Sequence, residues 1–196
     1  MTEQENFSMR YWNYFCALEQ DLKKVSRFIE FSSDNMSTHS IELTRLLLSS
    51  CSEIDVIFKE ICSLLDENSS VENINQYRRE IKSLLPDIIN EKVNVGFSGL
   101  DIRPWQNWNG DKNPNWWRSH NNVKHQRNIY FADANLLNTI NAISALFICV
   151  NYYYKIKLSG ILNQNLNFSD VTRVLKSQNN FIRFSNNEYY DKHFLV

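Results

Sequence analysis

Residues 40–66 read SIELTRLLLSSCSEIDVIFKEICSLLD and form the most apolar helical pattern of the chain. Apolar residues recur there at three- and four-residue spacing on more than one face of the expected helix. One row runs through Leu47, Cys51, Ile54, Phe58, Ile61 and Leu65. A helix that is apolar on nearly every side lies inside a protein rather than on its surface. This stretch therefore predicts the central helix of an all-α bundle.

Four further segments complete the predicted bundle of about five helices. Apolar residues with helical spacing mark about residues 9–31, 73–89 and 132–158, and a more polar helix is expected over 113–127. Pro86 is expected to end or kink the helix over 73–89, because proline lacks the N–H that a helix interior requires. Asn113 is expected to cap the polar helix, with Pro114 at its first position.

Residues 90–113 interrupt the helical pattern and predict a long Trp-containing loop before the polar helix. A short alternation typical of an extended segment appears at Val93, Val95 and Phe97. We expect Trp105 and Trp108 to pack the loop onto the bundle, and base stacking by one of the tryptophans at 105, 108, 116 and 117 is the alternative. After Gly160 we expect a tail, residues 161–196, with short extended or 3₁₀ pieces at 171–175 and 181–184.

Length and composition favour one domain spanning residues 1–196, with a core at about residues 9–160. The chain has 196 residues, of which 43% are hydrophobic, and this is enough to bury a sizeable core. Its net charge is −1, so contact with nucleic acid requires a local basic patch. The four cysteines lack metal-site spacing, and we predict no metal and no cofactor.

Targeting features favour a cytoplasmic protein without a membrane segment. The first residues, Met-Thr-Glu-Gln-Glu-Asn, are acidic and polar, unlike a signal peptide. The longest apolar run, Ala142 to Val150, is shorter than the roughly 18 residues that a membrane span needs.

The segment with the most specific chemistry is residues 116–127, WWRSHNNVKHQR. On a helix, residues seven apart lie about 20° apart around the axis, so Arg118 and His125 share a face with Asn121 or Asn122. Arginine binds phosphate, and histidine moves protons near neutral pH. The pattern therefore indicates a metal-independent phosphodiester-cleaving site, and a solvated basic helix face is the other interpretation.

This segment resembles the R-x(4–6)-H motif of HEPN domains (higher eukaryote and prokaryote nucleotide-binding). It is similar to a WW-x-x-x-N-x-V-K-H-x-R pattern of prokaryotic HEPN-like proteins. The resemblance covers about residues 41–154, and its other parts are residues 42–55, 131–138 and 143–147. Two departures stand out, because the six-residue spacing is the long end of the motif and Ser119 follows Arg118.

The resemblance implies an all-α homodimer in which the Arg–His helices of two subunits face each other across a cleft. Catalytic members are metal-independent RNA endonucleases that leave a 2′,3′-cyclic phosphate and a 5′-hydroxyl. Arg118 and His125 would be the motif pair, Asn121 or Asn122 the orienting residue, and Glu53 the upstream acid. A toxin or phage-defence effector, with an antitoxin or defence-system partner, is the expected biological class. A non-catalytic module that binds nucleotide, RNA or protein is the alternative.

Further candidates surround the motif pair. Substrate-binding roles are expected at Lys124, Arg127, Asn122 and His120. Lys124 and Arg127 would form a weak phosphate-steering patch, and His120 is either a reserve acid or base or a structural histidine. A carboxylate among apolar neighbours needs a partner, and this applies to both Glu53 and Asp55. The resemblance favours Glu53 as the acid that contacts the Arg118 or His125 region. A further option is that this Arg–His–Glu cluster only ties helices together.

Overall fold

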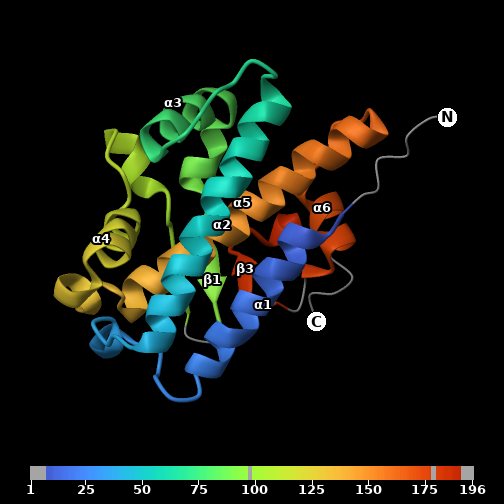
Figure 1. The fold of residues 1–196 in the computed structure, drawn as a ribbon. Helices are drawn as coiled ribbons and strands as arrows, with labels where there is room; N and C mark the ends of the chain where they lie inside the picture. The colour runs from blue at the N-terminus through green and yellow to red at the C-terminus, as the bar shows by residue number, and fades with distance from the viewer. Residues whose placement is uncertain (1–7, 97–98, 178–179, 191–196) are drawn as a thin grey trace.

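The computed structural model describes residues 8–96, 99–177 and 180–190, and it is mostly helical (Figure 1). Within these residues the α-helices are α1 (Arg10–Val25), α2 (Ile41–Leu65), α3 (Ile74–Leu84), α4 (Asn115–Tyr130), α5 (Leu136–Leu162) and α6 (Phe168–Leu175). A small sheet is formed by β1 (Val93–Val95), β2 (Leu100–Ile102) and β3 (Ile182–Phe184). The prediction of a helical protein is confirmed, but the bundle of about five helices becomes six helices with a sheet.

Helices α2 and α5 cross at the centre, with α1 on one side and α3 and α4 on the other (Figure 1). Ser40 caps α2 by accepting a hydrogen bond from the Leu43 N–H at 3.1 Å. The Thr139 hydroxyl of α5 donates to the Leu43 carbonyl at 3.2 Å, which ties the two helices together. The prediction that residues 40–66 form a central helix is thus confirmed.

Helix α5 is long and apolar enough to cross a membrane by length and composition, although its apolar run Ala142–Val150 is short. However, 83% of its apolar stretch is buried against the rest of the protein. This burial is what the core helix of a soluble protein shows, because each of its faces contacts another element.

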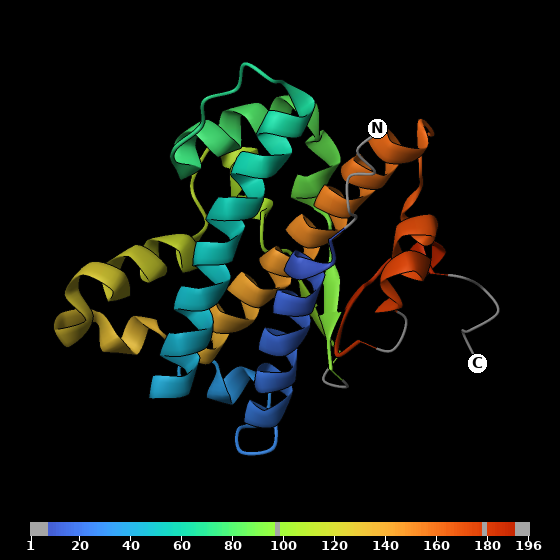
Figure 2. The ribbon, with the colours of Figure 1, turned by 45° about the vertical axis from the view of Figure 1, so that its right-hand side comes forward.

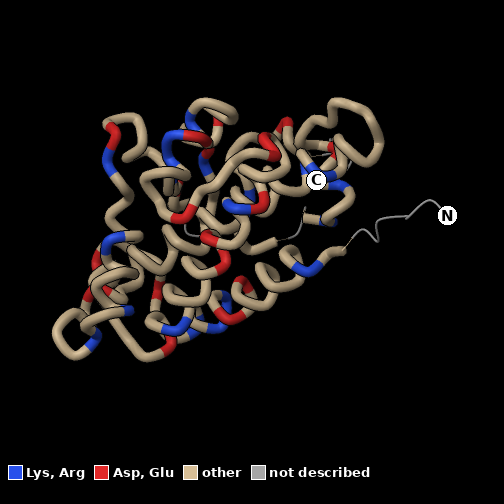
Figure 3. Tube along the Cα trace, turned by 45° about the horizontal axis from the view of Figure 1, so that its top comes forward, with Lys and Arg blue, Asp and Glu red and all other residues tan. Residues whose placement is uncertain are grey.

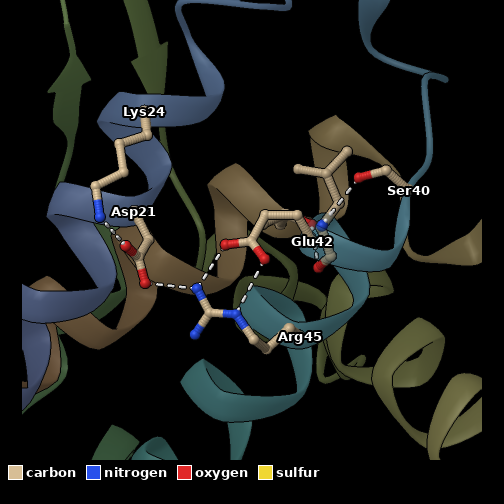
Figure 4. Close-up of polar contacts among 7 residues, drawn as sticks. Asp21, Lys24, Ser40, Glu42 and Arg45 are labelled. Atoms are coloured by element: carbon tan, nitrogen blue, oxygen red, sulfur yellow. Dashed lines mark hydrogen bonds and ion pairs between the residues drawn. The ribbon is translucent and has the colours of Figure 1, made fainter.

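An ion-pair cluster joins α1 to the start of α2 on the surface (Figure 4). Asp21 of α1 accepts from Lys24 on the same helix and from Arg45 of α2, and Arg45 also pairs with Glu42. Exposed ion pairs each contribute up to about 1 kcal/mol. The buried side chains of α1, Phe15 and Leu22 among them, therefore hold the helix in place more strongly.

The sheet brings the C-terminal segment into the core. Strand β1 is central and antiparallel to both neighbours, with Val93 opposite Ile102 on β2 and Phe184 on β3. The prediction of an extended segment at Val93 and Val95 is confirmed, whereas Phe97 lies outside the described residues. The prediction of an extended piece at 181–184 is confirmed by β3, and its pairing with β1 makes this part of the tail regular.

Helix α6 is a correction in the same segment. Residues 171–175 were expected to be extended or 3₁₀, but they lie in an α-helix that begins at Phe168. Asn167 caps it by accepting from the Asp170 N–H, while the Asp170 carboxylate accepts from the Asn167 N–H. This reciprocal pair is a capping box, and it starts a helix too short for periodicity to reveal.

The tryptophans of the long loop pack against α2, as predicted. Trp105 and Trp108 are fully buried, with ring centroids 4.5 Å apart, and Phe58 of α2 lies 5.1 Å from Trp105. Trp116 at the start of α4 lies 5.1 Å from Trp105 and donates its indole N–H to the Pro104 carbonyl at 2.9 Å. This aromatic cluster fixes the position of α4 relative to α2.

Candidate functional site

Helix α4 carries the motif, and it starts one residue later than predicted. Pro114 is the N-cap residue and Asn115 the first helical residue. Asn113 makes no cap; its side chain instead accepts from Arg78 and donates to Asn75, each at 2.9 Å. It therefore fastens the loop to α3, because both partners belong to that helix.

The two faces of α4 differ completely in their surroundings. The buried face carries Trp116, Trp117, His120 and Val123. Arg118, Asn121 and His125 are exposed on the other side, and α4 lies at the periphery in both views (Figures 1 and 2). Within residues 8–96, 99–177 and 180–190, no hydrogen bond or ion pair involves the side chain of Arg118 or His125. The motif pair therefore points away from its own core.

A kink divides α4 directly after the motif. Gln126 has φ −142° and ψ 50°, which is not helical. Arg118 through His125 lie in the regular part, so their shared face follows from helical geometry, with about 10 Å along the axis between them. Arg127 lies beyond the kink. Helical spacing does not hold across Gln126, so a patch shared by Arg127 and Lys124 stays a prediction.

Of the two candidate orienting residues, Asn122 forms a side-chain hydrogen bond within the described residues and Asn121 does not. The Asn122 side chain donates to the Asp133 carboxylate at 3.0 Å, across the kink. Asn138 of α5 donates to the Ser119 hydroxyl at 3.1 Å and to the Asp133 carbonyl at 2.8 Å. These bonds hold the turn that follows α4. Asn121 is thus the amide that remains exposed beside Arg118 and His125.

His120 lies on the buried side of α4 and is 6% exposed. Burial lowers its pKa to about 4, and the nearby charges of Lys124 and His125 add to this effect. The imidazole is therefore neutral at physiological pH. Its Nδ1 is buried with no hydrogen-bond partner in the described part of the chain, and its ring lies 5.4 Å from Trp117. It is separated from the Arg118–His125 face by the body of the helix.

The two acids of α2 lie on different sides of that helix. Burial raises the pKa of Glu53, and the charge of Arg10 on α1 opposes that rise. Glu53 thus faces α1, and it forms no bond with Arg118 or His125 in the described residues, so the predicted contact is wrong. Asp55 is the acid on the α4 side, where it accepts from Tyr77 at 2.6 Å and from Lys59 at 2.7 Å.

A pocket of about 570 Å³ lies between α2, the start of α3 and α4. Its walls include Ser52 and Asp55 from α2, and Trp117, His120 and Lys124 from α4. Asn121 also lines it, so the pocket adjoins the exposed motif face. The sequence carried one sign of this pocket, because residues 117, 120, 121 and 124 have the three- and four-residue spacing of a single helix face.

Comparison of the chain with protein-family models, with curated proteins and with solved structures found no match. Charge offers no global guide either, because basic and acidic residues are interspersed along the whole trace (Figure 3). In the described ranges no three His, Cys, Asp or Glu side chains lie close enough together to hold a metal ion. The chemistry of the site must therefore be argued from α4 itself.

Proposed function

We propose that the protein is a cytoplasmic, metal-independent endoribonuclease of the HEPN type, active as a homodimer. Arg118 and His125 of two copies would face each other across a cleft and cleave RNA between them. A toxin or phage-defence effector, with an antitoxin or defence-system partner, is the biological role that fits this activity.

The observation that carries this proposal is the exposed, unpaired Arg118–His125 face. Both side chains lie in the regular part of α4 and neither has a partner in the described residues. An Arg–His–Glu cluster that ties helices together would need bonds inside the chain, and Glu53 faces Arg10 instead. A free guanidinium and a free imidazole on one helix face supply a group that binds phosphate and a group that moves a proton.

The reaction uses one histidine from each copy. One His125 removes the proton from the 2′-hydroxyl, whose oxygen then forms a bond to phosphorus. The bond from phosphorus to the 5′-oxygen breaks, and His125 of the second copy gives that oxygen a proton. Arg118 stabilises the negative charge that develops on the phosphate. The products are a 2′,3′-cyclic phosphate and a 5′-hydroxyl, and no other reactant is consumed.

A single copy supplies only half of this machinery, which is why the proposal includes a dimer. Exposed apolar side chains flank the junction between α4 and α5: Ile129 is 67% exposed, Leu137 is 46% exposed and Tyr130 is 37% exposed. Apolar surface of this kind beside a polar site is typical of a protein interface. A second copy docked there would bring its own α4 next to the first.

One observation favours the second candidate, a non-catalytic module that binds RNA, nucleotide or protein. No carboxylate of this chain contacts His125 in the part that the structure describes, so none orients the imidazole or stabilises its charged form. The same Arg118–His125 face would then hold a phosphate without cleaving it, and His125→Ala would change binding alone.

The test is cleavage of total RNA by the purified protein in EDTA, with analysis of the new ends. The proposal expects 2′,3′-cyclic phosphate ends from the wild type, and a loss of at least about 100-fold in rate for Arg118→Ala and for His125→Ala. Arg27→Ala is the control, because Arg27 is also an exposed arginine but lies in the turn after α1, outside α4. Folded wild-type protein that leaves RNA intact would contradict the proposal.

A further inference from the structure

The pocket between α2, α3 and α4 has no part in the reaction described above. Its volume of about 570 Å³ lies in the range of small-molecule sites, roughly 300–1,000 Å³. Its lining is mixed, with apolar side chains such as Leu48 and Ile74 beside polar ones such as Ser52 and Asn121. Such a lining suits a flat, partly apolar group with a hydrogen-bonding edge.

The wall formed by α4 contains a buried polar group without a partner. His120 lines the pocket, is 94% buried, and its Nδ1 makes no hydrogen bond within the described residues. Burial keeps this imidazole neutral, so one ring nitrogen donates and the other accepts. A polar ligand would contact the part of the ring that lines the pocket.

The same wall provides an aromatic surface. Trp117 lines the pocket next to His120, with 5.4 Å between the ring centroids. Trp117 is 7% exposed, so a small part of its ring is open to the pocket. Contact of a base with an aromatic side chain accepts any base. The exposed amide of Asn121, one turn along the same face, offers a donor and an acceptor to the edge of such a base.

The opposite wall disfavours a phosphate inside the pocket. Asp55 and Glu72 line the α2 and α3 sides, and their carboxylates repel anions. The one cation in the lining is Lys124, which is exposed and next to His125 in the chain. The charges thus place an uncharged group inside and a phosphate outside, toward the Arg118–His125 face.

We propose that this pocket binds one unstacked nucleobase of the RNA strand whose phosphate lies against Arg118 and His125. The base packs against the exposed part of Trp117 and hydrogen-bonds to Asn121 and His120, while Lys124 contacts the backbone at the mouth. The pocket thereby sets which nucleotide flanks the cleaved bond. This inference rests on the proposed function for the placement of the phosphate, but base binding itself does not require cleavage.

Binding is tested with AMP, GMP, CMP and UMP, and with ribose 5-phosphate as the probe that lacks a base, by NMR titration of the wild type. We expect at least one nucleotide to bind at least tenfold more tightly than ribose 5-phosphate, and to shift the His120 and Trp117 ring signals. Ser52→Phe fills the pocket from an exposed position and should weaken binding of that nucleotide at least tenfold. Asn121→Ala should weaken its binding by at least the same factor. Arg27→Ala, which lies outside this pocket and outside the Arg118–His125 face, should bind the nucleotide normally.

Equal binding of ribose 5-phosphate and all four nucleotides would contradict base binding in this pocket. Nucleotide binding that Ser52→Phe leaves unchanged would contradict it as well. Cleavage of RNA without a preferred flanking base, together with absent nucleotide binding, would remove this inference and leave the ribonuclease in place. Base binding without any RNA cleavage would support base binding in the pocket and contradict the proposed catalysis.

Discussion

Helix α4 presents two faces that obey different rules. On the inner face Trp116, Trp117 and Val123 are packed, and even His120 is buried and neutral. On the outer face Arg118 and His125, the residues with the most useful chemistry, have no partner among the described residues. The inner face explains why the helix is held where it is. The outer face has no structural explanation within one chain, and this contrast is the reason to seek its function there.

The largest expected effect comes from breaking the inner face. Trp116→Ala removes a buried ring that contacts Trp105 and Trp117 and leaves the Pro104 carbonyl without its donor. We expect the free energy of unfolding to fall by about 3–5 kcal/mol. Urea unfolding followed by circular dichroism measures it. A change below about 1 kcal/mol would mean that the aromatic cluster does not anchor α4.

His120 gives the inner face a pH dependence. Its pKa is about 4 in the folded protein, below the ordinary value of 6.5, so the unfolded chain binds more protons between these values. The stability that the neutral His120 contributes is fully present above about pH 6.5. It is lost as the pH falls through about 4. We expect the wild type to lose on the order of 3 kcal/mol more than His120→Gln over this window. Parallel urea titrations of both proteins from pH 7 to pH 4 measure this difference. Equal losses of unfolding free energy would contradict the role of His120.

The two neighbouring asparagines distinguish the faces at a smaller scale. Asn122→Ala breaks the bond to Asp133 and should lower the free energy of unfolding by about 1 kcal/mol. Asn121→Ala removes an exposed amide and should change it by less than about 0.5 kcal/mol. Thermal unfolding of the two variants measures both changes. Equal losses of stability would contradict the claim that Asn122, and not Asn121, holds the turn after α4.

The smallest stability effects are expected on the outer face. Arg118→Ala and His125→Ala remove side chains that make no bond in the described parts of the chain. Each should leave the free energy of unfolding within about 0.5 kcal/mol of the wild type. A loss of 2 kcal/mol in either variant would reveal a structural role and would weaken the case for a functional one.

The sequence predicted those elements whose signals are local. Ser40 marks the start of α2, and Pro86 directly follows the C-cap residue of α3. The buried rows of α2 and α5 follow the helical period. Pairing between β1 and β3 joins residues about 90 apart, and no local pattern indicates such a partner. The sequence therefore predicted an extended piece at 181–184 but not the strand with which it pairs.

The site shows the same division between local and distant information. The shared face of Arg118 and His125 follows from spacing along one helix. The kink at Gln126 was not predicted, because nothing in the residues around it breaks a helix by composition. The choice between Glu53 and Asp55 depended on how α2 is rotated against α4, which is set by packing between helices and not by either helix alone.

A subunit-mixing measurement decides whether the outer face is half of a shared site. Heterodimers of wild-type protein and His125→Ala, purified through two different affinity tags, are compared in EDTA with both homodimers for the rate of RNA cleavage. Because one histidine from each copy is needed, the heterodimer should be at least about 100-fold slower than the wild-type homodimer. A heterodimer with half of the wild-type rate would show that each chain carries a complete site, and the shared cleft would be wrong.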